Sequence, residues 1–74
     1  MKQRYLLEYY CDVQPYVRHG NSNGYKHLEN AKKAVNRLAV KYSRDFTGAR
    51  IYDTDTTDER TCAAKCVYKV VGLP

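Results

Sequence analysis

The sequence predicts a single α+β domain, in which one amphipathic helix packs on one face of a three-stranded antiparallel sheet. Apolar residues recur at the spacing of a helix between residues 28 and 42. Apolar and polar residues alternate, as they do in strands, within 3–13 and 61–71, and a shorter strand pattern covers 49–53. The predicted order is therefore strand, helix, strand, strand. Its length of 74 residues suits one small domain spanning residues 1–74.

The predicted helix has an apolar face and a basic face. The apolar side chains that share one arc of the helical wheel are Leu28, Ala31, Ala34, Val35, Leu38, Ala39 and Tyr42. The basic side chains on the opposite arc are Lys33, Arg37, Lys41 and, if the helix reaches it, Arg44. Lys26 and His27 stand where a capping Ser, Thr, Asp or Asn is expected, so the helix start lacks a good N-cap. We expect the apolar face to pack on the sheet.

Each strand is expected to present one face to the helix and one to the outside. In the first strand the odd-numbered residues from Tyr5 to Val13 form the helix-facing set, and Tyr10 points outward. The core face predicted for the last strand consists of Cys62, Ala64, Cys66, Tyr68 and Val70. The open face is then predicted to carry Leu6, Glu8, Tyr10, Arg50, Tyr52, Lys65, Val67 and Lys69.

Polar segments connect these elements. Residues 14–27 contain Asn-Ser-Asn-Gly, which either closes a hairpin between 16–18 and 25–27 or lies in a mobile loop. Residues 53–60 are predicted to form a hairpin loop, and Gly48 to stop the segment that follows the helix. A right-handed crossover followed by a hairpin places the last strand between the other two, which gives the spatial order 1-3-2.

Composition and cysteine spacing indicate a cytoplasmic, basic protein. The net charge is +5 and the pI is near 9.2, which favours anionic partners. Neither a signal-peptide pattern nor an apolar run long enough to span a membrane is present, so we expect a location in the host cytosol and no membrane partner. On a strand, Cys62 and Cys66 would lie about 13 Å apart, too far for a disulfide. The cysteines are therefore expected to be reduced, buried thiols.

The sequence predicts neither a metal site, a cofactor site nor a catalytic site. The cysteine and histidine spacings differ from those of zinc sites. Asp53, Asp55 and Thr57 match the first positions of a calcium loop, but Asp58 replaces the required glycine. Both histidines lie in the long connection, away from the predicted core-facing cysteines, so a Cys–His nucleophile pair is not expected. We therefore predict a protein that is not an enzyme.

Two predicted surfaces remain as candidates for binding. Lys33, Arg37 and Lys41 repeat every four residues, so each faces a like charge along the helix, which costs a few tenths of a kcal/mol per pair. This basic face is either an ordinary solvated surface or a docking surface for phosphates or carboxylates. Tyr10 and Tyr52 on the open face can stack nucleic-acid bases or anchor a protein interface, or the face is ordinary exposed surface.

The whole pattern resembles that of small phage and prophage proteins. The residues that carry the resemblance are Met1-Lys2 before a Tyr-rich strand, the helix segment Glu29-Asn30-Ala31-Lys32-Lys33-Ala34, and the segment Gly48-Ala49-Arg50-Ile51-Tyr52-Asp53 before a closing strand. Some anti-CRISPR inhibitors have a similar strand–helix–strand–strand order and a similar basic surface. The resemblance covers nearly the whole chain at the level of pattern. It implies a compact protein that acts by occupying a surface on a larger host complex.

The sequence therefore predicts a non-enzymatic binding protein, phage- or mobile-element-encoded, that inhibits a host defence or nucleic-acid-processing complex. The alternative is direct binding of nucleic acid through the same cations, which predicts a steep dependence on salt. A homodimer formed through the open face or an unpaired strand edge is a further alternative. The residues expected to contact the partner are Lys33, Arg37, Lys41, Arg44, Tyr10, Tyr52, Lys65 and Lys69.

Overall fold

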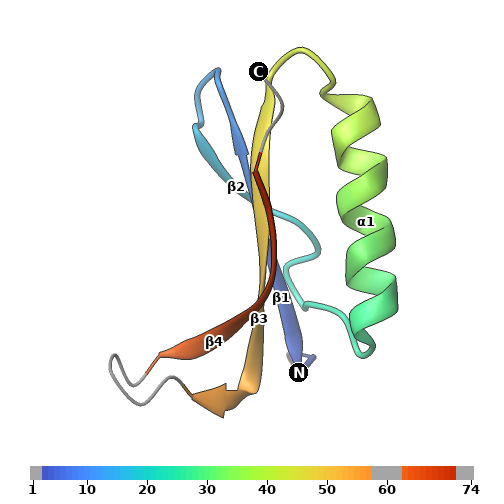
Figure 1. The fold of residues 1–74 in the computed structure, drawn as a ribbon, viewed down its shortest axis with the longest axis vertical. Coiled ribbons are helices and arrows are strands. Elements are labelled where there is room, and N and C mark those ends of the chain that lie inside the picture. Colours follow the sequence, from blue (N-terminus) through green and yellow to red (C-terminus); the bar gives the residue numbers. More distant parts are fainter. Residues whose placement is uncertain (1–2, 58–62, 72–74) are drawn as a thin grey trace.

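The computed structural model describes residues 3–57 and 63–71 and contains one helix and one antiparallel sheet (Figure 1). The elements are β1 (Tyr5–Cys11), β2 (Val17–His19), α1 (Leu28–Lys41), β3 (Phe46–Thr57) and β4 (Ala64–Val71). The four strands lie in the order β2-β1-β3-β4, and α1 packs on one face of the sheet. The predicted α+β class is confirmed, whereas the predicted number and order of strands are wrong.

The additional strand, β2, lies in the segment predicted to be a loop or an independent hairpin. Val17–His19 pairs with β1, in a register that sets Tyr10 opposite Val17. The Asn-rich turn does not close a hairpin between 16–18 and 25–27, because Tyr25 forms a bridge with Tyr5 instead. Gly24 has a φ of +81°, and an added Cβ would lie 2.7 Å from the Tyr5 carbonyl oxygen. The turn therefore requires glycine at this position.

The strand order differs because the chain doubles back before the helix begins. After β2, residues 20–27 return to the starting end of β1, where Tyr25 meets Tyr5. α1 then runs back along the sheet, so β3 starts beside Cys11 and runs antiparallel to β1 (Figure 1). The right-handed crossover rule applies to parallel strands and therefore does not govern this connection. As a result β3 lies between β1 and β4, and the last strand is at the edge of the sheet.

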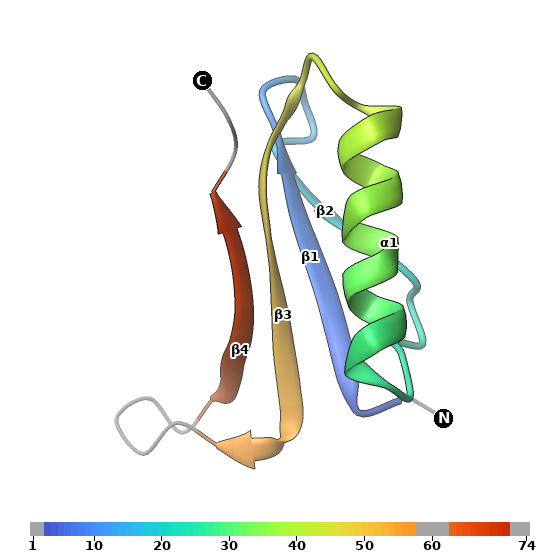
Figure 2. The same ribbon diagram turned by 45° about the vertical axis from the view of Figure 1, so that its right-hand side comes forward.

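The apolar face of α1 and the odd-numbered face of β1 form the core, as predicted. The buried apolar residues are Leu7, Tyr9, Cys11, Ala31, Ala34, Val35, Ala49 and Ile51. Ile51 and Val35 are the largest fully buried side chains. Val13 was expected on this face, but it is 48% exposed because β1 ends at Cys11. α1 packs on β1 and β3. β4 lies on the side of β3 that faces away from β1 (Figure 2).

The helix bounds agree closely with the sequence pattern. His27 occupies the N-cap position with extended backbone angles, and its side chain makes no capping hydrogen bond. Tyr42 forms the C-cap, donating its backbone N–H to the Leu38 carbonyl oxygen. Gly48 was predicted to stop the segment after the helix, but it is paired within β3 to Tyr10 and Val71.

β3 extends into residues predicted to form a hairpin loop because Asp53 is tied to the sheet. Asp53 is only 4% exposed, and its two carboxylate oxygens accept hydrogen bonds of 2.8 Å from the Arg4 guanidinium. The same carboxylate accepts the Asp55 backbone N–H and the Thr56 hydroxyl. Both oxygens of the buried carboxylate therefore accept hydrogen bonds, which offsets the cost of burying its charge. The part of the predicted loop at 58–60 lies outside the described residues.

A change of register in the β3–β4 pair moves Cys66 out of the predicted core. Ile51 pairs with Tyr68, but the next residue, Tyr52, pairs with Cys66, so Val67 is an extra residue in β4. Beyond this bulge the two faces of β4 exchange. Cys66 is therefore exposed on the open face, whereas Cys11 is buried as predicted. Cys62 lies outside the described residues.

Candidate functional site

Three cations line one flank of α1, and we call Lys33, Arg37 and Lys41 the basic ridge. All three side chains are exposed, and Arg44 is exposed just past the helix end. Within 3–57 and 63–71, the ion pairs join only Arg4 to Asp53 and Asp55, so no carboxylate neutralises the ridge. The Val40 side chain is 78% exposed on the same outer surface of the helix. Helical spacing places Val40 one turn from Arg37, on the same side of the helix.

Aromatic rings extend this cationic surface at the C-terminal end of α1. Tyr9 and Tyr42 stack with ring centroids 5.9 Å apart. The Arg18 guanidinium carbon lies 5.2 Å from the centroid of the Tyr42 ring, and the Lys41 Nζ lies 5.3 Å from it. Arg18 also donates hydrogen bonds to the carbonyl oxygens of Pro15 and Gln14, so its guanidinium is already held in place.

The two stacked tyrosines have opposite pKa shifts. Hydrogen bonding from Tyr9 and the charge of Lys41 lower the pKa of Tyr42. Burial raises the pKa of Tyr9, and its hydrogen bond to Tyr42 adds to this effect. The hydrogen bond contributes to both shifts, because Tyr9 donates it and Tyr42 accepts it. The Tyr42 hydroxyl therefore lies in a positive environment that favours negative charge.

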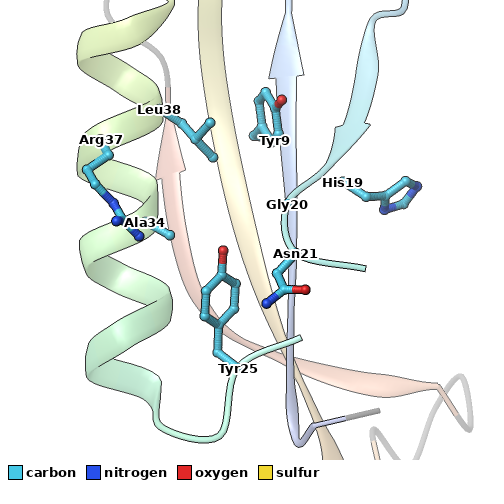
Figure 3. Close-up of a pocket in the computed structure, with 8 residues that line it drawn as sticks. All are labelled: Tyr9, His19, Gly20, Asn21, Tyr25, Ala34, Arg37 and Leu38. Carbon is cyan, nitrogen blue, oxygen red and sulfur yellow. The ribbon is translucent and has the colours of Figure 1, made fainter. Parts of the chain in front are cut away.

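A pocket of about 300 Å³ lies between α1 and the segment that follows β2 (Figure 3). The residues that surround it include Tyr9, Asn21, Tyr25, Ala34, Arg37 and Leu38. The Tyr25 hydroxyl points into the space between α1 and residues 20–21, and the His19 ring points away from the helix. The Asn21 Oδ1 accepts the Asn23 backbone N–H at 3.0 Å, which leaves the amide nitrogen as the free end of the side chain.

The open face of the sheet contains a second set of the predicted residues. The Tyr10 hydroxyl donates a hydrogen bond to Glu8, and the Tyr52 hydroxyl donates one at 3.5 Å to the same carboxylate oxygen. Both tyrosine side chains are half-buried. Burial and the Glu8 carboxylate raise the pKa of Tyr10 well above its usual value. The Arg50 guanidinium carbon lies 5.8 Å from the Tyr10 ring centroid.

Strand register aligns charged residues across this open face. His19 lies opposite Glu8, Glu8 opposite Arg50, and Arg50 opposite Lys69. Paired residues share a sheet face, so this row runs across all four strands. Lys65 was expected on the open face too, but it pairs with Asp53 beyond the bulge and so lies on the opposite face.

The predicted partner-contacting residues therefore fall on two opposite sides of the sheet. The basic ridge lies on the helix side, with Arg44 beyond its end, whereas Tyr10, Tyr52 and Lys69 lie on the open side. One flat partner surface cannot contact both sides. The ridge is thus combined in space with Arg18, Tyr42 and the pocket, and not with the open-face tyrosines.

Sequence reasoning missed Asn21 and Tyr25 as neighbours of the ridge, whereas Arg18 was already a candidate to extend the basic face. Asn21 and Tyr25 lie in the return segment that passes beside α1. Tyr16 and Val17, two residues that favour strands, were the available signal for β2, but two residues are too few to predict one. Tyr9 and Tyr42 were both expected on core-facing surfaces, and their rings stack there.

In the described part of the chain, no three His, Cys, Asp or Glu side chains gather as a metal site would require. The helix found in that part is too short and polar to cross a membrane. Comparisons with known protein families, with curated proteins and with solved structures found no match to this chain.

Proposed function

We propose that this chain is a non-enzymatic binding protein that inhibits a host defence or nucleic-acid-processing complex in the host cytosol. It docks the basic ridge on an acidic surface of that complex. The observation that carries the proposal is the exposure of Lys33, Arg37 and Lys41 with no carboxylate partner among the described residues. Three like charges in a row destabilise the helix slightly, and an anionic partner would relieve this repulsion.

The ridge is a better candidate for docking than the open face. Tyr10 and Tyr52 are half-buried and bonded to Glu8, whose carboxylate lies in the middle of that face. That face therefore carries mixed charge, because Glu8 lies in one row with Arg50 and Lys69, and it attracts an acidic partner less than the ridge does. On the helix side, Val40 is exposed among the cations and offers an apolar contact. Protein interfaces combine an apolar centre with a polar rim, so this arrangement favours a protein partner.

The resemblance to small phage proteins and anti-CRISPR inhibitors supports the inhibitory role. The support comes from the basic surface, which suits a small protein that blocks a site on a larger one. The strand–helix–strand–strand order behind the resemblance is changed by β2, which precedes α1. A phage or mobile-element origin belongs to the same proposal. Because the ridge lies on one flank of α1, the proposed contact is confined to the helix side of the molecule.

Paired charge reversals test the proposal. We expect Arg37→Glu/Lys41→Glu to abolish capture of the partner from a bacterial lysate, because it replaces attraction by repulsion. Lys65→Glu/Lys69→Glu changes the net charge equally, but on β4, and should leave capture intact. Proteins retained by the wild type and the β4 variant, identified by mass spectrometry, are then tested for inhibition as purified complexes. Equal capture by the wild type and the ridge variant would contradict the proposal.

Direct binding of nucleic acid by the ridge is the alternative function. The spacing of the three cations along one flank favours contact with a phosphate backbone. Titration of single- and double-stranded DNA and RNA by fluorescence anisotropy tests it. Three phosphate contacts predict a slope of about −2.7 for duplex DNA and about −2 for single strands in a plot of log affinity against log salt concentration. Absence of binding at low salt would exclude this alternative.

A further inference from the structure

We infer that the pocket between α1 and residues 19–25 receives a carboxylate side chain from an acidic segment of the protein partner. This inference rests on the proposed function and specifies the chemistry of its contact. The pocket borders the basic ridge through Arg37, so a partner that docks on the ridge passes over its opening. Its volume of about 300 Å³ is at the small end for ligand sites, which suits one side chain.

Asn21, Tyr25 and Arg37 each bring a hydrogen-bond donor to the pocket, whereas the His19 ring points away from the helix. Asn21 uses its Oδ1 to accept the Asn23 N–H, and Figure 3 shows its amide nitrogen on the side nearer Tyr25. The Tyr25 hydroxyl and the Arg37 guanidinium have no protein hydrogen-bond partner within 3–57 and 63–71. An amide N–H, a hydroxyl and a guanidinium together match the acceptor oxygens of an anion.

The remaining lining favours a carboxylate over a phosphate. Leu38 and Ala34 present apolar surface on the helix side of the pocket, where the methylene groups of a glutamate can pack. Arg37 is the cation among the lining residues, and the guanidinium of nearby Arg18 is occupied by two carbonyl oxygens and the Tyr42 ring. A single guanidinium balances the single charge of a carboxylate and forms two parallel hydrogen bonds with it. Lys33 and Lys41, one turn to either side, can attract neighbouring acidic residues.

A peptide titration followed by NMR tests this inference. The probe is a short peptide of alternating Glu and Leu, and the control peptide replaces every Glu with Gln. We expect the Glu peptide to shift the Gly20 amide, the Asn21 side-chain amide and the Arg37 Nε–H signals, and the Gln peptide to leave them unchanged. An equal response to both peptides would overturn the inference.

Two matched pairs of variants separate the pocket from general attraction. Asn21→Asp keeps the turn acceptor but replaces the donor with negative charge, and should weaken binding of the Glu peptide at least tenfold. Asn23→Asp adds the same charge two residues away and should change the affinity for the Glu peptide by no more than about threefold. Arg37→Gln should likewise cost about tenfold, and Lys33→Gln about threefold. An equal loss of affinity within each pair would show that the peptide binds by general charge attraction, and would refute the inference that the pocket receives a carboxylate.

Tyr25→Phe removes one donor and keeps the ring, so it tests the pocket with little change in packing. If it weakens capture of the partner about tenfold, the inference is supported. If Arg37→Glu/Lys41→Glu abolishes capture but Tyr25→Phe and Asn21→Asp do not reduce it, the proposed function stands and the pocket inference fails. A dT10 oligonucleotide that shifts the same three signals more strongly than the Glu peptide would make the pocket a phosphate site and overturn the inference.

Discussion

At the scale of single residues, Asp53 links the start of β1 to the end of β3. Its carboxylate is buried and receives a two-point hydrogen bond from Arg4. The Arg4 guanidinium holds the pKa of Asp53 well below its usual value of 3.8. The folded state therefore keeps this carboxylate charged at pH values where the unfolded chain takes up a proton.

We predict that this pair contributes stability at neutral pH that is lost as the pH falls below about 4, toward the lower pKa of the folded state. Asp53→Asn should lower the Tm by several degrees at pH 7, and the difference from the wild type should shrink at about pH 2 to 3. Thermal unfolding of both proteins across this pH range measures the effect. Asp55→Asn, at an exposed carboxylate 3.5 Å from Arg4, is the control and should change stability little. A constant difference at all pH values would contradict the prediction.

At the scale of elements, α1 is stabilised by packing, and its first turn is poorly capped. His27 has the extended backbone of an N-cap residue but no side-chain hydrogen bond to the helix. The stability of the helix comes instead from its apolar face, where Ala31, Ala34 and Val35 are all buried. The start of the helix is therefore a position where stability can be added without changing the core.

We predict that His27→Asp stabilises the protein by about 1 kcal/mol, because the carboxylate accepts free backbone N–H groups and interacts favourably with the helix dipole. In a domain of this size the Tm should rise by about 4–8 °C. Thermal unfolding followed by circular dichroism measures the change. His27→Ala serves as the control and should match the wild type. The same Tm for the Asp and Ala variants would refute the capping explanation.

The sequence predicted the elements whose signal is local and missed those that depend on pairing. The period in 28–42 gave α1, and the alternation from Tyr5 to Cys11 gave the core face of β1. Val17–His19 is a strand because β1 lies beside it, and three residues carry too little pattern to show this. The bulge at Val67 also left no signal, so counting by twos placed Cys66 and Lys65 on the wrong faces.

The sequence was enough to predict the basic ridge of the candidate site, but not the pocket beside it. Helical spacing alone is enough to place Lys33, Arg37 and Lys41 along one exposed flank. The pocket brings Asn21 and Tyr25 to that flank through the return segment, a tertiary arrangement that no local pattern encodes. Strand pairing also determines that Tyr10 and Tyr52 lie on the side of the sheet opposite to the ridge.

At the scale of the whole molecule, the outer edge of β4 is a free strand edge in the described structure, since β4 pairs only with β3. Val67 is 37% exposed and Val71 is 73% exposed along it. The exposed side chains of Lys65 and Lys69 place positive charge on the same strand. Lysine on an edge strand opposes pairing with a second copy.

We predict that the protein sediments as a monomer at micromolar concentration, because two copies would bring like charges together at this edge. Lys65→Thr/Lys69→Thr, which removes the charges and favours strands, should shift the distribution toward dimers. Analytical ultracentrifugation of both proteins at equal concentration measures this. A wild-type dimer that the double substitution leaves unchanged would show that the lysines do not control association.

The change of register at Val67 also has a practical consequence. It turns the Cys66 thiol to the side of the sheet away from α1. A fluorophore attached there, in a variant with Cys62 replaced by serine, would be separated from a partner on the helix by the full thickness of the sheet. Such a conjugate can report capture of the partner by slowed tumbling, without the dye competing for the contact.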